Sequence, residues 1–164
     1  MNPSPTPPRL VVCEWLTPRQ IEMNLKATTK DDLLAELVAK IPEFDSQPEA
    51  RQTLLKALIE REELYSTGVG EGVAFPHSRN ALVGLVDKPV LVFGRHPEGI
   101  AYGAEDGVPA RLFFLLVAPN VSLHLQILAR LGRLMRDPRL RRALLAADQP
   151  ENAIELLKQA EATL

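Results

Sequence analysis

The segment most suggestive of chemistry is residues 66–77, which reads Ser-Thr-Gly-Val-Gly-Glu-Gly-Val-Ala-Phe-Pro-His. Its alternating glycines permit positive φ angles and let a ligand or partner approach the backbone closely. Pro76 restricts the backbone that leads into His77. This composition favours a loop that presents His77, although an ordinary glycine-rich turn with a partly exposed histidine fits the same residues.

Residues 66–77 do not match the glycine-rich loops that bind nucleotides. A dinucleotide fingerprint needs Gly-x-Gly-x-x-Gly between a strand and a helix, and a Walker A loop ends in Gly-Lys-Ser or Gly-Lys-Thr. Neither spacing occurs here. Nucleotide binding is therefore disfavoured.

His124 is the second histidine of interest, because it falls at the start of an apparent helix. The unpaired amides and the positive end of a helix N-terminus favour an anion such as phosphate. A capping or partly buried histidine is the plainer interpretation of the same position. His77, His124 and Cys13 are also a conceivable zinc site, but they lack any ligand-spacing signature. We therefore expect no metal and no other cofactor.

Composition indicates one ordinary globular unit. The chain has 164 residues, of which 46% are hydrophobic and 24% charged, and a chain of this length forms a single core. We expect a proline-rich flexible tail over residues 1–8 and a single domain over residues 9–164. The net charge of -2 lacks the basic excess of dedicated nucleic-acid binders, so no nucleic acid is expected as a partner.

Three features of the sequence predict the cellular compartment. The single cysteine, Cys13, excludes an internal disulfide and suits a reducing compartment. The start of the chain holds four prolines within eight residues and reads as no secretory signal. The longest apolar run, Leu112 to Ala118, is far shorter than the roughly 20 residues of a membrane-spanning helix. We expect a cytoplasmic protein with no membrane insertion.

Periodicity and capping residues predict helices at both ends of the chain. Thr29 is a plausible N-cap for the first helix, and Ser46 with Glu49 resembles a capping box for the second. The predicted helices are Asp31 to Ile41, from Ser46 to about Leu64, Val121 to Met135, a shorter piece after Pro138, and a last helix from near Pro150.

The middle of the chain predicts strands. Val86 to Phe93 and Arg111 to Val117 are rich in Val, Leu and Phe and are bounded by turn residues. The second run is apolar at successive positions, which is typical of a strand buried on both faces. Helices on either side of a strand-rich centre favour an α/β fold, a three-layer sandwich with a central mixed β-sheet flanked by helices.

Several motifs together carry a resemblance to a known family. They are Glu60-Arg61-Glu62, Ser66-Thr67-Gly68, the spaced glycines, Pro76-His77, Asp106-Gly107, the Leu112 to Val117 strand and His124-Leu125. In this order they closely resemble the fructose/mannitol-type enzyme IIA domain of the bacterial phosphoenolpyruvate-dependent sugar phosphotransferase system. The resemblance covers approximately Leu16 to Leu157 and includes the stand-alone nitrogen-regulatory members.

The resemblance implies a phosphoryl relay. The histidine-containing phosphocarrier protein, or its nitrogen-branch equivalent, would donate a phosphoryl group to His77, which would pass it to an acceptor such as an enzyme IIB domain. In the family the ring nitrogen used is Nε2, and a neutral imidazole nitrogen can attack phosphorus in line. His124 matches the family's second histidine, which lies beside the first and can donate a hydrogen bond to phosphoryl oxygens.

Other residues receive expected roles from the same resemblance. Arg61 matches an arginine near the site, where its planar fork suits phosphate oxygens. An ordinary surface arginine that pairs with neighbouring glutamates is the alternative. Thr67, Gly68 and Gly70 are the loop residues expected nearest the phosphate, through a hydroxyl or backbone N–H groups.

Two functional classes share this site. One is a sugar-uptake component of a fructose/mannitol permease, and the other is a regulatory protein whose phosphorylation state alters its binding to target proteins. The absence of an appended enzyme IIB, membrane or carrier segment favours the nitrogen-regulatory type. A binding domain that no longer accepts phosphate is less compatible with the joint presence of Arg61, His77 and His124.

The last motif is a basic run. Six arginines lie between Arg130 and Arg142 at nearly helical spacing, which could form a stripe for an acidic protein or RNA. Such runs are more often solvated helix faces. His96 matches no motif and is predicted to lie in a surface loop.

Overall fold

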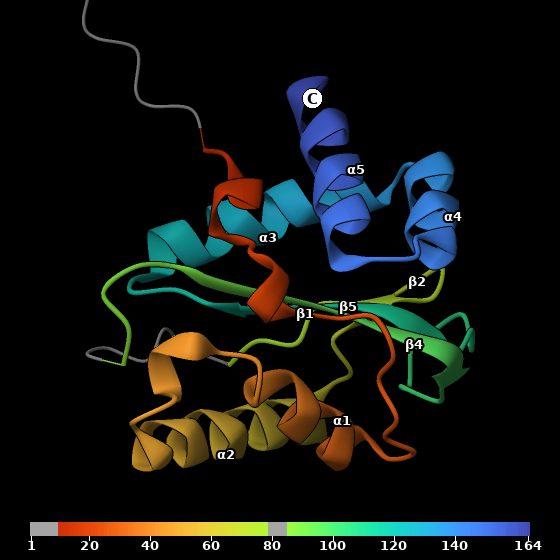
Figure 1. Cartoon of the computed structure of the whole chain (residues 1–164). Coiled ribbons are helices and arrows are strands. Elements are labelled where there is room, and N and C mark those ends of the chain that lie inside the picture. The colour runs from red at the N-terminus through yellow and green to blue at the C-terminus, as the bar shows by residue number, and fades with distance from the viewer. Residues whose placement is uncertain (1–9, 79–84) are drawn as a thin grey trace, which may run out of the picture.

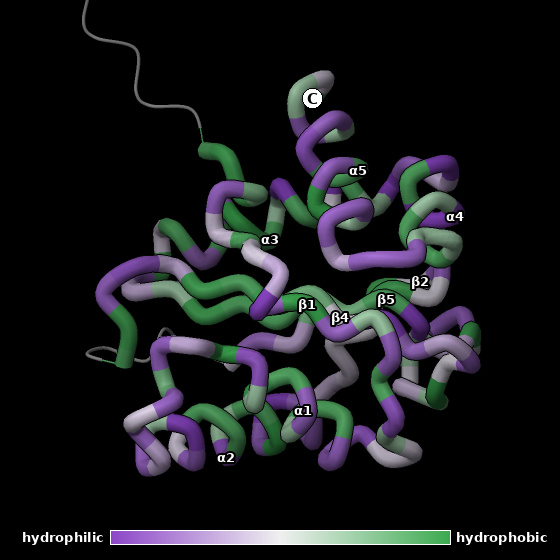
Figure 2. Tube along the Cα trace, in the orientation of Figure 1, coloured by the Kyte–Doolittle hydropathy of each residue, from purple (hydrophilic) through white to green (hydrophobic). Residues whose placement is uncertain are grey.

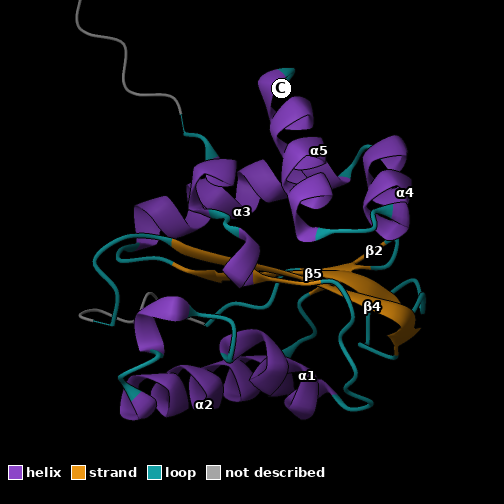
Figure 3. Ribbon diagram, in the orientation of Figure 1, coloured by secondary structure: helices purple, strands orange, loops and turns teal. Residues whose placement is uncertain are grey.

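The chain folds around one mixed β-sheet between two layers of helices (Figures 1 and 3). The computed structural model describes residues 10–78 and 85–164. Within these residues the strand order is β1-β4-β5-β3-β2, with β1–β4 and β3–β5 parallel and the other two pairs antiparallel. The strands are β1 Ile21–Glu22, β2 Gly68–Gly70, β3 Val73–Ala74, β4 Val90–Ile100 and β5 Ala110–Val117. The predicted three-layer α/β sandwich is confirmed.

Within the described residues, helices form the two outer layers of the fold. Two α-helices cover one face of the sheet and three cover the other (Figure 1). The first pair is α1 Lys30–Val38 and α2 Pro48–Leu64; the other three are α3 Val121–Met135, α4 Pro138–Ala146 and α5 Pro150–Ala162. Short 3-10 turns lie at Val12–Trp15, Pro18–Gln20 and Pro42–Phe44. The helix predicted over 121–135 is confirmed at both ends.

Capping explains most of the helix starts. The Thr29 side chain accepts a hydrogen bond from the Asp32 N–H at 3.2 Å, as predicted, and Asn120 caps α3 in the same way. The predicted capping box of the second helix is wrong. Gln47 is the N-cap residue of α2 and its side chain makes no cap bond; Pro48 begins the helix because its fixed φ suits the first turn.

Strand β5 is the centre of both cores. Side chains alternate across it, so Phe114 faces α3, α4 and α5 while Phe113 faces α1 and α2. Figure 2 shows this band of apolar residues along the sheet, with polar residues on the outer helices. Burial of β5 on both faces, predicted from its apolar run, is confirmed.

Strand β4 differs from the prediction of Val86 to Phe93. It begins later, at Val90, because Pro89 has no N–H to donate to a neighbouring strand. It also continues to Ile100, with a shift in register between Arg95 and Ile100. The residues between these two are typical of a turn, so their pattern does not indicate a strand. Gly94 is needed inside it, because a Cβ there would lie 2.6 Å from the Leu37 Cδ2 atom of α1.

The predicted division into a tail over 1–8 and a domain over 9–164 stays a prediction, because residues 1–9 lie outside the described residues. Among residues 10–78 and 85–164, no helix combines the length and apolarity needed to cross a membrane.

Candidate functional site

The glycine-rich segment forms a β-hairpin, β2–β3, at one edge of the sheet. Gly70, Glu71 and Gly72 have φ angles of 91°, 57° and 77°, which makes the tight turn that their sequence suggested. At Gly70 a side chain would also meet Asp106, whose Oδ2 lies 3.0 Å from the position of an added Cβ. The turn therefore depends on glycine at position 70 for its conformation and for space.

The backbone around His77 is fixed by the centre of the sheet. Strand β3 runs parallel to β5, and the alignment continues to an isolated bridge between His77 and Leu116. The Leu116 N–H donates to the Pro76 carbonyl at 3.1 Å. The His77 backbone is thus held by β5, which is buried on both faces, although His77 lies in no regular strand of its own.

The His77 ring has a defined tautomer. Its Nδ1 lies 2.6 Å from the Phe75 carbonyl oxygen, which can only accept, so Nδ1 carries a proton. Burial lowers the pKa of His77 below 6.5; the Phe75 carbonyl raises it, the Arg61 charge lowers it further and Glu62 raises it. The ring is neutral at pH 7, and Nε2 keeps its lone pair. This is the state that a nucleophilic imidazole requires.

His124 lies against His77, at the end of the first turn of α3. The two ring centroids are 5.1 Å apart and the rings meet edge to face at 64°. Burial and the neighbouring His77 lower the pKa of His124 below 6.5, so this ring is also neutral at pH 7. Its Nδ1 is buried with no hydrogen-bond partner among the described residues. No hydrogen bond therefore fixes its tautomer, and the ring can take the form that donates toward His77.

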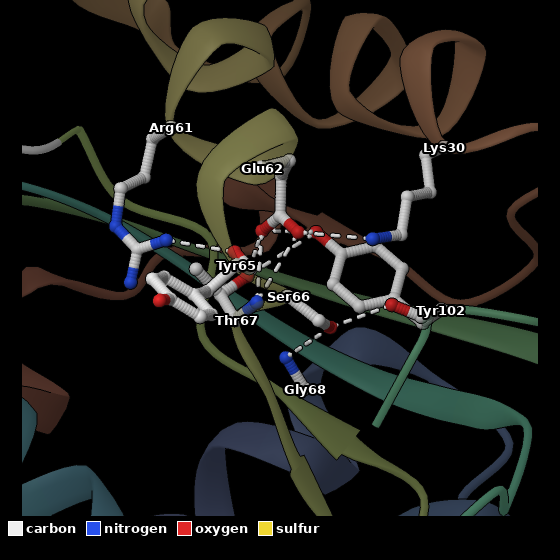
Figure 4. Close-up of polar contacts among 8 residues, drawn as sticks. All are labelled: Lys30, Arg61, Glu62, Tyr65, Ser66, Thr67, Gly68 and Tyr102. Carbon is white, nitrogen blue, oxygen red and sulfur yellow. Dashed lines mark hydrogen bonds and ion pairs between the residues drawn. The ribbon is translucent and has the colours of Figure 1, made fainter. Parts of the chain in front are cut away.

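A cavity of about 630 Å³ opens beside His77 and brings together most of the residues predicted for the site. Arg61, Thr67, Gly68 and Gly70 all line it with His77. Arg61 does not pair with a neighbouring glutamate; its Nη1 donates to the Tyr65 carbonyl at 2.7 Å, at the end of α2 (Figure 4). A permanent positive charge is thereby held at the cavity wall.

A buried carboxylate that the sequence reasoning gave no role holds this wall in place (Figure 4). Glu62 accepts hydrogen bonds from the Thr67 N–H at 3.2 Å, from the Thr67 hydroxyl and from the Tyr102 hydroxyl at 3.0 Å. Lys30 Nζ balances its charge at 3.2 Å. The Glu62 side chain therefore links α2 to Lys30 at the start of α1, to Tyr102, and to Thr67 just before β2.

Two of the predicted phosphate-binding residues already use their hydrogen-bond donors within the chain. The Thr67 hydroxyl is engaged by Glu62, and the Gly68 N–H donates to the Ser66 hydroxyl oxygen at 2.9 Å. Both donors are already used within the chain, so a phosphate contact from either would have to replace an existing hydrogen bond. Their role in binding phosphate stays a prediction.

Two other histidine and cysteine interpretations change. His96 is not a surface-loop residue: it is buried in β4, where its Nε2 bonds the Ala27 carbonyl at 2.8 Å and its Nδ1 accepts from the Gly99 N–H. Cys13 is buried against Glu161, where burial first and then the carboxylate raise the pKa of the thiol. Within residues 10–78 and 85–164, no three potential ligands of the His, Cys, Asp or Glu type lie together as a metal site, so the conceivable zinc site is not formed there.

Comparison with known protein families identifies the family of this chain. Residues 14–160 match the family described as phosphoenolpyruvate-dependent sugar phosphotransferase system, EIIA 2. The chain belongs to this family. The resemblance read from the sequence is confirmed.

Curated EIIA relatives include both functional classes. The nitrogen regulatory protein of Bradyrhizobium diazoefficiens is 34% identical over 154 residues, which cover 93% of this chain and 97% of the relative. The fructose-specific EIIABC component of Bacillus subtilis is 33% identical over 150 residues, which cover 90% of this chain and only 23% of that larger protein.

Solved EIIA structures have the same fold. The crystal structure of the nitrogen regulatory protein IIA-Ntr from Neisseria meningitidis superposes with a TM-score of 0.78 at 28% identity, over 89% of this chain and 98% of that one. The enzyme IIA of mannitol from Escherichia coli, solved in complex with phosphorylated enzyme IIB, gives a TM-score of 0.75 at 26% identity, over 88% and 97%.

Removal of the Glu62 carboxylate is expected to loosen the site. We predict that Glu62→Gln lowers the free energy of unfolding by about 1–3 kcal/mol, because it removes the charge that pairs with Lys30 and replaces one acceptor oxygen by an NH2 group among buried donors. Urea unfolding followed by circular dichroism measures this. Glu60→Gln, exposed on the same helix, is the matched control and should change stability by less than about 0.5 kcal/mol. Equal stabilities for the two variants would contradict the role given to Glu62.

The lowered pKa values predict how the site responds to acid. Both histidines should titrate with midpoints below 6.5, measured from their ring carbon-bound proton shifts by NMR. Because the folded-state pKa lies below the unfolded value, the unfolded chain binds protons first as the pH falls. Stability from these rings is thus complete above pH 6.5 and declines below it. Arg61→Gln should raise the His77 midpoint; an unchanged midpoint would mean that the guanidinium does not act on the ring.

Proposed function

We propose that this EIIA domain is a phosphoryl carrier that accepts a phosphoryl group on His77 and transfers it or signals by its phosphorylation state. The observation that carries the proposal is the 2.6 Å contact between Nδ1 of His77 and the Phe75 carbonyl. It leaves Nε2 as the free nucleophile at the cavity, next to the Arg61 charge. Family membership supplies the reaction class.

The proposed step is an in-line transfer between two imidazoles. The Nε2 lone pair of His77 attacks the phosphorus of a phosphohistidine on the phosphocarrier; the new N–P bond forms as the carrier's N–P bond breaks, and the electron pair returns to the carrier's ring. The Nδ1–H group stays hydrogen-bonded to the Phe75 carbonyl, and this acceptor stabilises the positive charge that the His77 ring gains. His124 and Arg61 face the incoming phosphoryl oxygens.

The nitrogen-regulatory type is the preferred class. The relative from Bradyrhizobium carries the name nitrogen regulatory protein and is covered almost completely by this chain, as is the IIA-Ntr structure. In this class the phosphorylation state changes how the domain binds target proteins. The alternative is a sugar-uptake role with an enzyme IIB acceptor, which the similarity to the mannitol enzyme IIA complex supports.

The test of this function is labelling by the complete relay. Incubation with phosphoenolpyruvate, enzyme I and the histidine-containing phosphocarrier is expected to label the chain with phosphate that is labile in acid and stable in base. ATP alone should give no label, because residues 66–77 form no nucleotide-binding loop. Absence of label with the complete relay, from a carrier that is itself phosphorylated, would contradict the proposal.

A further inference from the structure

A second cavity, of about 250 Å³, lies between the β2–β3 turn, the start of β5 and helix α4. It shares two wall residues, Glu71 and Arg141, with the cavity beside His77. Its described lining includes none of the residues predicted for the phosphoryl site. Its volume of about 250 Å³ is below the range of roughly 300–1,000 Å³ that is typical for drug-sized ligands, so the cavity suits a smaller ligand.

Arg111 reaches this cavity because β5 is irregular at its start. The N–H groups of Arg111 and Leu112 both donate to the Gly72 carbonyl, at 2.8 and 3.0 Å. Two successive donors on one acceptor are typical of a β-bulge, which re-aims a side chain. Arg111 and Leu112 accordingly both line the cavity, although neighbours in a regular strand face opposite sides of the sheet.

The Arg111 guanidinium is incompletely hydrogen-bonded. Among residues 10–78 and 85–164 it makes a single hydrogen bond, from Nη2 to the Pro97 carbonyl at 2.7 Å. Its Nε is buried and has no partner among the same residues. An unsatisfied buried donor is destabilising, and more so in a charged group. Arg111 therefore has hydrogen-bonding capacity that no described residue uses.

Positive charge exceeds negative charge around the cavity. Arg141 and Arg142 of α4 line it with Arg111, and Glu71 is the one carboxylate in its described wall. Glu71 offsets little of this charge, because its side chain is 74% exposed and lies 3.7 Å from Arg141 Nη2. Arg142 is exposed and has no hydrogen bond or ion pair among the described residues. A ligand with two negative charges would balance the excess.

The remainder of the described wall favours an organic ligand over an inorganic ion. Apart from Gly72, its residues are apolar: Val108, Pro109, Leu112, Pro138 and Leu145. Apolar walls exclude water, and the attraction between an arginine and an anion is stronger where water screens it less. They also provide contacts for a carbon skeleton, which sulfate and inorganic phosphate lack.

The arginines predicted as one basic stripe over 130–142 have separate environments. Arg130 is paired with the buried Glu161 at 2.8 Å. Arg141 is fixed in the wall of both cavities by a 2.6 Å bond from Nη1 to the Met135 carbonyl. Only part of the run therefore faces the smaller cavity, and there it meets Arg111 from β5.

We propose that the cavity between the β2–β3 turn and α4 binds a small organic dianion, a dicarboxylate or a phosphate monoester, through Arg111, Arg141 and Arg142. Its acidic groups would bind the guanidinium groups, and its carbon skeleton would contact the apolar wall. The anion would compete with Glu71 for Arg141. This binding goes beyond the proposed function, because it requires neither phosphoryl transfer nor His77.

Titration of the full chain with succinate and with glycerol phosphate tests the proposal. Calorimetry measures the affinity, and ¹⁵N NMR locates the site through the backbone amides of Gly72, Arg111 and Leu145. We expect at least one probe to bind once per chain, with a Kd of about 1 mM or tighter, and to shift these amides. The probe that binds distinguishes a dicarboxylate from a phosphate monoester. Sulfate, which has the charge without the carbon skeleton, should bind several-fold more weakly.

Two substitutions should change the affinity in opposite directions. Arg142→Gln removes one charge from an exposed residue without a described partner, and it should weaken binding by about tenfold or more. Glu71→Gln removes the competing carboxylate and should tighten binding by about two- to fivefold. Arg139→Gln is the matched control: Arg139 is exposed on α4 and is not part of the described cavity wall, so the affinity should stay parental.

The remaining outcomes would overturn the proposal. They are no saturable binding of either probe, amide shifts confined to the His77 cavity, and parental affinity in Arg142→Gln. An equal loss in Arg139→Gln would also overturn it, because the attraction would then come from the general charge of α4. Equal affinity for sulfate would overturn the choice of an organic ligand. None of these results bears on phosphoryl transfer, because the variants keep His77 in place.

Discussion

Replacement of His77 by glutamine is expected to abolish phosphoryl transfer to the chain, with label from the complete relay falling to background. A glutamine amide has no nucleophilic lone pair on nitrogen, because that pair is delocalised into its carbonyl. The fold should survive, since within residues 10–78 and 85–164 the side chain's one hydrogen bond is to the Phe75 carbonyl, and such a bond contributes about 0.5–1.5 kcal/mol. Labelling and thermal unfolding of the same preparation measure both effects.

Ser78 provides the matched control for His77. It follows the histidine directly and carries the only hydroxyl next to it, so it could be mistaken for the phosphorylated group. Ser78→Ala should accept phosphate at the parental level. Label that persists in His77→Gln and disappears in Ser78→Ala, or in a variant of another histidine, would reassign the site.

Substitution of His124 is expected to separate support from attack. His124→Ala should still be phosphorylated on His77, but should pass the group onward about 100 to 1,000 times more slowly. The reason is that loss of one preorganised donor costs about 2.7–4 kcal/mol when it acts mainly on the transition state, as oxyanion-hole deletions do. The centroid of the His124 ring lies 5.1 Å from that of His77, close enough for a ring N–H to reach oxygens of a phosphoryl group bound to His77.

Single-turnover transfer from the phosphorylated protein to its acceptor measures the His124 effect. Phosphorylated parent and variant are mixed with the same acceptor, and the decay of label on His77 is followed. His124→Gln, which retains a donor, should recover part of the rate if hydrogen bonding is the cause. Identical rates for parent and alanine variant would make His124 only a packed residue of α3.

The sequence predicted the parts of this fold that carry long patterns. The helix over 121–135 has a polar cap and a continuous apolar stripe, and β5 has an uninterrupted apolar run; both were located correctly. Strands β1 and β3 are two residues long, too short for alternation to show, and they exist only through pairing with β4 and β5. Such elements depend on tertiary contacts rather than on local sequence.

The site was predictable to a similar extent. His77 and its loop stood out because glycines, proline and histidine are adjacent in the sequence. The Glu62 network did not, because Lys30 and Tyr102 are distant in the sequence and meet only in the fold. One signal was available: Glu62 continues the buried stripe of Leu54 and Leu58 at intervals of four, which places a carboxylate on an inward-facing row of α2.

The most direct test of the account is to determine which nitrogen carries the phosphoryl group. The chain is labelled with ¹⁵N at its histidines, phosphorylated by the complete relay, and the phosphorus–nitrogen coupling is read by NMR. We predict coupling to a single nitrogen, Nε2 of His77, because Nδ1 is held by the Phe75 carbonyl. Phosphorus on Nδ1 of His77, or on either nitrogen of His124, would contradict the central claim.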